Sequence, residues 1–350
     1  MTVKVSKPAI NVREELADLK KPTGIAGQAM LAAETPQEQF QLIGAGRRNL
    51  IINGDFQVTQ RGDYSSNTGV SQNTYYIDRW KHLVQVVTAQ IRRDNGVVID
   101  GKPMSVFRME ATSSATGRMG IRQTVEARGT RCPIEDGPAT LSVWMRSTNP
   151  NACLLFYQYS GGGYIGHKPY TGRGEWQKLS LTVEASPSAL THSAVSLELN
   201  FGIHTAANGN VSITSGDYIE IAQPQLELGK VATPFEHRSY GEELALCQRY
   251  YVHYDLASYQ RLAATSYCDI NNRTQVDISL PVPLRSYVSA GHTNLTISGQ
   301  AVNGVNLTQT GSNGNILTGN LTCPGTPLTV GTIYQIYTIG AGNFYVNGEI

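Results

Sequence analysis

The chain has 350 residues, of which only 16% are charged, and it contains 35 glycines. This length exceeds that of a usual single-core domain, and the composition is typical of a β protein rich in turns. Lys and Arg (28) nearly balance Asp and Glu (27), which excludes a bulk charge that would attract nucleic acid or an anionic membrane. We therefore expect a partner that is neutral or is another protein.

The first 46 residues predict two short helices. Asn11 is the candidate N-cap of the first, while Thr35, Pro36 and Glu38 begin the second with a capping box. Because helices of this length are not stable alone, we interpret residues 1–46 as a segment that anchors the chain to a larger particle. A helical flap packed on the next domain is the alternative. The apolar residues expected to make the anchor contact are Val12, Leu16, Leu19, Phe40, Leu42 and Ile43.

Residues 47–237 alternate apolar and polar side chains between turn signals. The runs with strand character are NLIING, VFRMEA, MGIRQTVEA, ATLSVWMRS, ACLLFYQYS, WQKLSLTVEA, AVSLELNFGI and YIEIAQPQLEL. Asn95-Gly96 predicts a turn between strands. About eight strands without intervening helices predict a two-sheet antiparallel sandwich, and a jelly roll is the commonest arrangement of that number. Trp80 and Trp144 are expected in its core.

Residues 238–251 predict a helix that connects two β domains. Ser239 is its N-cap and Glu242 is the third helical residue of a capping box. The residues of its apolar side are Leu244, Leu246, Cys247, Tyr250 and Tyr251. Such a helix can dock both neighbouring domains and fix their relative angle, or it can pack against its own copies in an oligomer.

Residues 252–350 predict a second, smaller sandwich of about seven strands. The runs that carry this prediction are VHYDLA, LAATSYCDI, TQVDISLPVPL, NLTISGQ, NILTGNL, TIYQIYTI and NFYVNGEI. The predicted fold class is thus all-β: a jelly-roll sandwich followed by a second small β-sandwich, with a short helical N-terminal anchor and a connecting helix.

Several phrases of the chain are distinctive: RRNLIINGDFQVTQRG, DRW at Asp78 to Trp80, the strand that contains Trp144, EWQKLSLTVEA and IEIAQPQLELGKVATPFEHRSYGEELALCQRYY. Together they resemble a family of bacteriophage virion proteins known as tail-fibre or tail proteins. The opening KPAINVREELADL also resembles the amino-terminal attachment segments of phage fibre-like proteins. The resemblance covers most of residues 1–251. It implies a jelly roll similar to carbohydrate-binding modules, followed by a further β domain, in a homotrimeric virion component made in the bacterial host cytoplasm.

Attachment to the tail and attachment to the head of the particle both remain open. A capsid fibre or decoration protein is therefore one alternative, and a dedicated polysaccharide receptor-binding module is another. The expected partners are other copies of the chain, phage tail or capsid proteins through the N-terminus, and host surface polysaccharide. Neither nucleic acid nor membrane insertion is expected.

The resemblance also raises the question of calcium. Jelly rolls of this type often place an acidic residue near the end of the last strand to help hold a structural calcium ion, whereas the matching residues 221–224 read IAQP. Asp55 and Asp217 remain as oxygen donors, but calcium takes six to eight oxygen ligands. No cofactor is therefore expected.

No motif for catalysis or transition-metal binding stands out. The chain has no H-E-x-x-H, no G-x-S-x-G, no P-loop and no G-x-G-x-x-G after a strand, and its seven His residues are scattered. Its five cysteines lie far apart, so buried thiols are expected instead of zinc ligands or disulfides. We expect neither a catalytic site nor enzymatic activity.

The densest mixture of Tyr, Gly and polar residues is YQYSGGGYIGHKPYTGRGEW, at residues 157–176. The apolar C–H face of a sugar ring stacks on aromatic side chains, while its hydroxyls seek polar groups, so this stretch predicts glycan contact. The alternative is that these tyrosines fill strand faces or a subunit seam. The candidate glycan-binding residues are Tyr159, Tyr164, His167, Tyr170 and Arg173.

Overall fold

The computed structural model of the chain describes residues 48–125, 137–158, 163–184, 197–205, 209–262, 265–270, 273–285, 289–297, 300–310, 316–322, 328, 330, 333 and 335–349. The predicted anchor, with its six apolar residues Val12, Leu16, Leu19, Phe40, Leu42 and Ile43, lies outside the described residues. Within the described part, the structure contains no helix whose length and apolar character would let it cross a membrane.

The first sandwich consists of two six-stranded sheets. One sheet has the strand order β1 (Thr68–Val70), β3 (Ala89–Ile99), β4 (Lys102–Ala111), β12 (Tyr218–Leu228), β6 (Ala139–Ser147), β9 (Gln177–Val183). The other has the order β11 (Val211–Ile213), β5 (Ala115–Val125), β10 (Leu197–Ile203), β7 (Ala152–Gln158), β8 (Gly163–Pro169), and β2 (Lys81–Gln85) also pairs with β5. We call these the β12 sheet and the β10 sheet.

The strand order identifies the first sandwich as a jelly roll. From β4 onwards, the eight strands β4 to β10 and β12 form the antiparallel orders β4-β12-β6-β9 and β5-β10-β7-β8, so the chain repeatedly crosses between the sheets. β1, β3, β2 and β11 extend this framework. The predicted fold class is confirmed for this part of the chain, although β1, β2, β3, β8 and β11 were not predicted.

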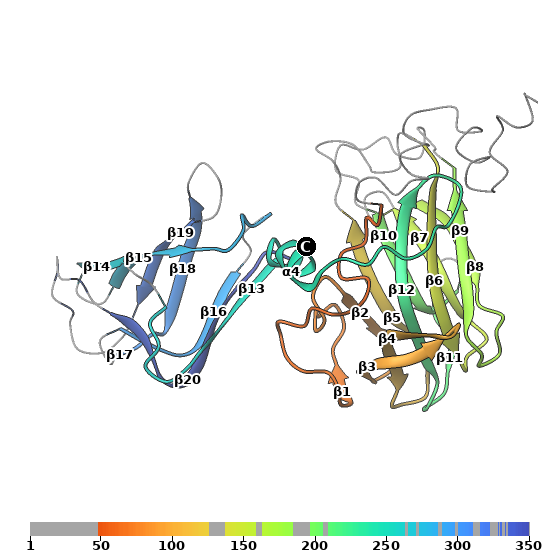
Figure 1. The fold of residues 1–350 in the computed structure, drawn as a ribbon. Coiled ribbons are helices and arrows are strands. Elements are labelled where there is room, and N and C mark those ends of the chain that lie inside the picture. The colour runs from red at the N-terminus through yellow and green to blue at the C-terminus, as the bar shows by residue number, and fades with distance from the viewer. Residues whose placement is uncertain are drawn as a thin grey trace, which may run out of the picture.

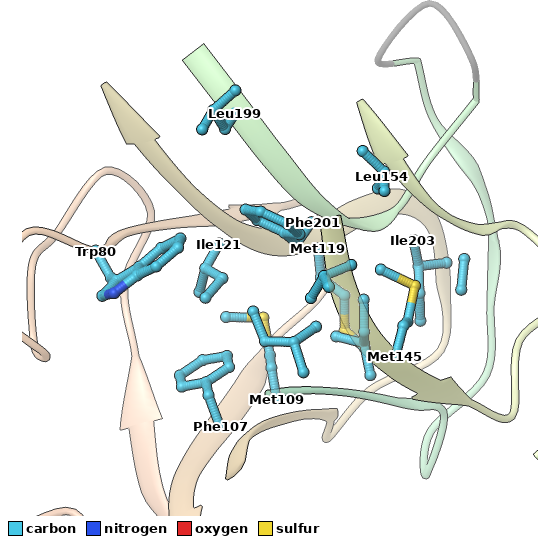
Figure 2. Close-up of a cluster of buried hydrophobic side chains, with 14 of the residues drawn as sticks. Trp80, Phe107, Met109, Met119, Ile121, Met145, Leu154, Leu199, Phe201 and Ile203 are labelled. Carbon is cyan, nitrogen blue, oxygen red and sulfur yellow. The ribbon is translucent and has the colours of Figure 1, made fainter. Parts of the chain in front are cut away.

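The core lies between the two sheets because alternate residues of each strand point inward. Figure 2 shows Trp80, Phe107 and Phe201 with the methionines and branched aliphatic residues that pack between the sheets. Trp80 is fully buried, as predicted, and its ring lies 5.3 Å from Phe56 and 5.7 Å from Phe201 between centroids. A cluster of this kind supplies most of the favourable free energy of folding.

The run NLIING, predicted as a strand, forms a turn instead. Asn53 has φ +58°, which no strand allows. The segment docks on β12 at the bulge between Ala222 and Gln225, where the ladder is interrupted. There the Asn49 amide donates to the Pro224 carbonyl at 3.3 Å, and its oxygen accepts from Leu226 N–H at 3.1 Å. The segment thus supplies hydrogen-bond partners to backbone groups that the bulge in β12 leaves without a ladder partner, and the local sequence gives no sign of this.

The turn predicted at Asn95-Gly96 is also wrong. Both residues lie inside β3, where a register shift between Asp94 and Val97 forms a bulge and Gly96 has φ +73°. The hairpin between β3 and β4 turns at Asp100-Gly101, with φ +51° and +71°. Two positive φ values in a two-residue loop match the twist of antiparallel strands.

The connecting helix is α4 (Tyr240–Gln248), and its predicted cap is confirmed. The Ser239 side chain accepts a hydrogen bond from Glu242 N–H at 3.3 Å. Leu246 and Cys247 are buried within the chain itself, as are Tyr250 and Tyr251 just after the helix. The apolar side of α4 therefore packs within one chain, which was one of the two predicted arrangements.

The second sandwich has two four-stranded sheets. One has the order β13 (Tyr251–Leu256), β20 (Ile336–Asn347), β16 (Ser289–Ile297), β17 (Gln300–Ala301), and we call it the β20 sheet. The other has the order β14 (Thr265–Ile270), β15 (Arg273–Ser279), β19 (Ile316–Thr322), β18 (Gly304–Thr310). TIYQIYTI and NFYVNGEI, predicted as separate strands, contribute to the single strand β20, in which Gly340 adopts φ +80°. The hydrophobic core of the second sandwich is distinct from that of the first.

Candidate functional site

The predicted glycan-binding residues lie on and after the hairpin of β7 and β8. Tyr159 is outside the described residues, and Tyr164 lies in β8 with a side chain that is not among those described. His167 is half-buried on β8, opposite Leu155 of β7. Leu155 and its neighbour Asn200 are buried, so this outer face of the β10 sheet leaves little described surface beside His167.

Tyr170 does not offer a platform for a sugar, which corrects its assignment. It is only 4% exposed, and its hydroxyl donates to the Glu175 carbonyl at 2.6 Å and accepts from Gly174 N–H at 2.9 Å. A Cβ at Gly172 would lie 2.6 Å from the Tyr170 ring. The loop is therefore wrapped around the ring. Arg173, at the turn of this loop, has φ +48° and is exposed, so its role as a polar partner stays a prediction.

Aromatic side chains instead gather on the outer face of the β12 sheet. In β6, Val143 and Met145 point into the core, so Trp144 and Arg146 point outward. Trp144 is half-buried there, packed with Trp176 against a small apolar cluster outside the main core. The expectation that Trp144 belongs to the sandwich core is therefore wrong. We call Trp144, Trp176, Tyr218, Arg108, Arg146 and Glu220 the tryptophan face.

Charged groups fix the side chains of the tryptophan face. Glu220 of β12 is 3% exposed and accepts hydrogen bonds from Arg108 at 2.7 Å and from Arg146 at 2.5 Å. Burial alone would lower the pKa of Arg108, but hydrogen bonds with Glu110 and Glu220 outweigh it and hold that pKa above its ordinary value. Glu220 thus holds both guanidinium groups in place.

Each of these guanidinium groups also lies over an aromatic ring. The guanidinium carbon of Arg108 is 4.0 Å from the centre of the Tyr218 ring, and that of Arg146 is 5.0 Å from the Trp176 ring. Beside them a shallow hollow is lined by Ser142, Trp144, Lys178, Gln225, Thr233 and Phe235. Flat rings beside fixed donors and acceptors are the groups that bind a hydroxylated ring.

The second functional feature is the junction between the two sandwiches, which is built around the DRW sequence at residues 78–80. Asp78 is fully buried and accepts from Gln60 N–H at 2.6 Å and from Arg61 at 3.1 Å. Burial raises the pKa of Asp78 to about 6, while the Arg61 charge acts to lower it. Gln60 also donates to the Tyr251 carbonyl at 2.8 Å, at the start of the second sandwich.

The next residue of this sequence reaches further. Arg79 pairs with the Glu349 carboxylate at 2.5 Å, its backbone N–H donates to the same carboxylate at 3.2 Å, and its guanidinium lies 3.4 Å from the centre of the Tyr250 ring. Burial opposes the charge of Arg79, but Glu349 outweighs it and raises the pKa. Figure 1 shows the C-terminus beside α4, between the two groups of strands.

Helix α4 completes the junction on its other side. Glu243 is 5% exposed and accepts hydrogen bonds from the backbone N–H of Asn53 and from Arg238. Arg238 donates in turn to the Ile51 carbonyl at 3.0 Å. Burial raises the pKa of Glu243, and these hydrogen bonds act to lower it. Sequence analysis predicted a docked helix but not the residues that dock it, whose partners lie far away along the chain.

The two carboxylates considered for calcium serve other contacts. Asp217 accepts from Asn149 at 2.7 Å and from Thr214 N–H at 2.8 Å, and Asp55 accepts from Gln57 at 2.9 Å. Among the described residues, no group of three or more His, Cys, Asp or Glu side chains is placed to hold a metal ion. Cys153, Cys247 and Cys268 are buried free thiols, as predicted for these three.

Comparison with protein-family models finds no match, and comparison with curated proteins finds none either. Among solved structures, the chain is similar to TmCBM61 in complex with β-1,4-galactotriose (13% identity, 52% of this chain and all of that one, TM-score 0.29). It is also similar to a CBM4 structure (12% identity, 51% of this chain and 98% of that one, TM-score 0.28). A protein of Bacteroides thetaiotaomicron named for sugar binding is similar as well (11% identity, 52% of this chain and 100% of that one, TM-score 0.29). At such TM-scores these likenesses carry no conclusion about ligands. The jelly-roll assignment follows from the strand order of the chain itself.

Proposed function

We propose that this chain is a structural attachment protein of a bacteriophage particle. In this proposal residues 1–46 anchor it to the virion, the jelly roll of residues 47–237 and the sandwich of residues 252–350 project outward, and the chain works as a homotrimeric fibre. The proposal draws on the phrases that resemble phage virion proteins. Its location would then be the virion, after synthesis in the host cytoplasm.

The single observation that supports it best is the junction. A flexible linker would let the two sandwiches move independently, whereas here buried ion pairs and a docked helix connect them. A fixed relation between domains is a requirement of a projecting fibre, because it carries a binding face away from the particle in a defined direction. An enzyme with a mobile lid has the opposite requirement.

The tryptophan face favours host-surface polysaccharide as the contact of this fibre. Its rings and its fixed Arg and Glu groups suit a sugar, and the nearly neutral chain suits an uncharged ligand. A dedicated polysaccharide receptor-binding module is the second candidate, and this face favours it too. A head fibre or decoration protein with little glycan binding is the third.

Incorporation into particles tests the anchor. The full chain and a chain lacking residues 1–46 are supplied during assembly, and purified particles are probed for each. We expect only the full chain on the particles, with a solution mass three times the 38.0 kDa of one chain. Truncated chains found on particles at the normal level would show that the anchor assignment is wrong. A particle map would then separate tail from head attachment.

Binding of the full chain to host-surface polysaccharide tests the face. Trp176→Ala removes a ring beneath Arg146, and we expect it to weaken binding at least tenfold while incorporation stays normal. Tyr240→Ala, which changes a 55% exposed ring at the start of α4, is the matched control. Equal binding by the Trp176→Ala variant and the parent would exclude this face as the glycan contact.

A further inference from the structure

The outer face of the β20 sheet carries aromatic rings that the core does not use. Val252, Phe344 and Val346 point into the core of the second sandwich. Their neighbours along β13 and β20 therefore point outward. The outward rings, together with one from the loop after β13, are Tyr251, His253, Tyr259, Tyr337 and Tyr345, and we call this set the tyrosine face.

One end of this face is a flat group of rings. His253 and Tyr345 are directly opposite each other on β13 and β20, with ring planes only 12° apart and centroids 6.4 Å apart. On the other side of Tyr345 lies Gly291 of β16, where a Cβ would come within 2.4 Å of the tyrosine hydroxyl. Glycine at this position therefore lets the Tyr345 ring lie across the sheet, where the residue is half-buried.

Polar contacts hold this group in place. The Tyr251 hydroxyl and His253 Nδ1 are 3.1 Å apart, and His253 Nε2 is 3.0 Å from the Asp255 carboxylate. Arg61 of the first sandwich lies 3.6 Å from the centre of the Tyr251 ring and covers it. Asp255, whose side chain is 95% exposed, extends from the edge of the group as a hydrogen-bond acceptor.

The other end of the face carries a second pair of rings. Tyr259 is 70% exposed and stacks beside Tyr337 of β20, with centroids 6.3 Å apart and planes 29° apart. The backbone N–H of Tyr259 donates to the Thr338 carbonyl at 2.8 Å, which fixes the loop to the strand. Tyr345 and Tyr337 lie opposite Gly291 and Thr296, which are five residues apart on β16, so the two groups are separated by about 17 Å along the sheet.

The charge of the sheet restricts the ligand. The strands β13, β20, β16 and β17 contain no Lys or Arg and a single carboxylate, Asp255. These strands offer no cation to a phosphate or a carboxylate. The nearby cations come from outside them, namely Arg61 over the Tyr251 ring and the exposed Arg261 at a backbone bridge to Tyr337, so an anionic polymer is the alternative that the binding test compares. Flat rings with neutral hydrogen-bonding groups at their edges instead fit the C–H faces and hydroxyls of an uncharged sugar.

We propose that the tyrosine face is a second saccharide-binding surface, on which an extended neutral polysaccharide lies along β20 and contacts both ring groups. This inference deepens the glycan contact in the proposed function by adding a site on the second sandwich. Two contact points on one rigid sheet make long chains bind more tightly than short ones, because the second contact forms within the same complex.

The test is binding of the full chain to soluble galactan, xylan, dextran and mannan, with polygalacturonate as the anionic counterpart. Tyr345→Ala and Tyr259→Ala each remove one contact, and we expect each to weaken binding to the bound neutral polymer at least tenfold. Oligosaccharides too short to reach both groups should respond to only one of the two variants. Tyr345→Phe, which keeps the ring, and Tyr240→Ala, which changes a ring elsewhere, should bind like the parent.

Several results would overturn the inference. One is unchanged binding by both alanine variants, when circular dichroism and melting temperature confirm that they are folded. Another is the absence of binding to every neutral polymer. A third is conversion of an oligomer to monomers by Tyr345→Ala or Tyr259→Ala, because the rings would then be a contact between copies of this chain.

The outcome is separable from that of the proposed function. If Trp176→Ala abolishes binding and the tyrosine variants do not affect it, the tyrosine face is excluded while the attachment role stands. If chains without residues 1–46 still enter particles, the anchor is excluded while the saccharide site stands.

Discussion

Arg79 and Glu349 lie 270 positions apart in the chain and form a buried ion pair at 2.5 Å. Arg79 belongs to the first sandwich and Glu349 follows the last strand of the second, so this ion pair connects the two sandwiches. Both side chains are at most 4% exposed. The presence of a buried ion pair does not by itself show that the pair stabilises the fold. Removal of one partner, however, leaves the other charge buried and unpaired, which is strongly destabilising.

Glu349→Gln should therefore destabilise the junction by about 3–5 kcal/mol, because Arg79 keeps its charge and loses its carboxylate. We expect calorimetry to resolve separate unfolding of the two sandwiches in the variant, where the parent shows stronger coupling. Glu184→Gln, which changes a carboxylate that is 69% exposed, is the control. A single unfolding transition at the parent's temperature in Glu349→Gln would mean that the pair does not connect the sandwiches.

His82 should make the protein sensitive to mild acid. It is fully buried, its Nδ1 lies 2.9 Å from the Thr74 carbonyl oxygen, and burial lowers its pKa to about 4. As the pH falls, the His82 side chain is therefore protonated near pH 6.5 in the unfolded chain but only near pH 4 in the folded chain. Stability falls as the pH drops through this window, by on the order of 3 kcal/mol for this side chain.

Two other buried groups act in the same range. His204, whose pKa burial also lowers to about 4, has the same sign. Asp78 has the opposite sign, because its raised pKa of about 6 favours the folded state below pH 3.8 and that contribution is lost as the pH rises through 6. In His82→Asn, whose amide can still donate to Thr74, the unfolding free energy should change less between pH 6.5 and 4. At pH 8, where His82 is neutral, the difference in unfolding free energy between His82→Asn and the parent reports the packing change alone. If the unfolding free energy of His82→Asn falls between pH 6.5 and 4 as steeply as that of the parent, His82 is not the source of the acid sensitivity.

The sequence predicts the regular part of the fold well, for a local reason. ATLSVWMRS and YIEIAQPQLEL coincide residue for residue with β6 and β12, because alternation and strand propensity are properties of neighbouring residues. Ser239 as the N-cap of α4 is predicted for the same reason. Failures occur where a strand breaks its own pattern, as at Asn95-Gly96, since a bulge and a turn use the same residues.

The functional features depend largely on contacts that sequence does not display. Trp144 is an exception, because it shares its face of β6 with Thr140, Ser142 and Arg146, so alternation itself places the ring outside and only its apolar character suggests the core. Tyr170 belongs to a loop with binding-like composition, yet that loop folds around its ring. Glu349 carries no local sign of its partner 270 positions away. The contact that decides the role of Tyr170 forms within its own loop, whereas the contact that decides the role of Glu349 is distant in the chain.

Gly120 tests how closely β5 and β10 approach. It pairs with Gly202, and a Cβ added at Gly120 would lie 2.4 Å from the Phe201 carbonyl oxygen and 2.6 Å from the Gly202 Cα. Because these are backbone atoms, Gly120→Ala must shift a strand, and we expect a loss of about 1–3 kcal/mol in the free energy of unfolding. Gly69→Ala, at an edge strand with no atom within 4 Å of the new Cβ, should be close to neutral. Equal denaturation midpoints for the two variants would contradict this packing.

Glu220 tests whether the tryptophan face is built for binding or only for stability. Glu220→Gln leaves Arg108 and Arg146 without the carboxylate they share, which should cost roughly 1–3 kcal/mol in the free energy of unfolding. Glu110→Gln is the matched control, because Glu110 pairs with one guanidinium, that of Arg108, and its side chain is 28% exposed, so its cost should be smaller.

The same pair of variants distinguishes the two roles of this network. If the network orients Arg146 over Trp176 for a sugar, Glu220→Gln should weaken polysaccharide binding more than Glu110→Gln does at a temperature where both are fully folded. If both variants bind like the parent while only the denaturation midpoint of Glu220→Gln falls, the network stabilises the sheet without serving a ligand. The tyrosine face would then be the surface through which the chain meets a saccharide.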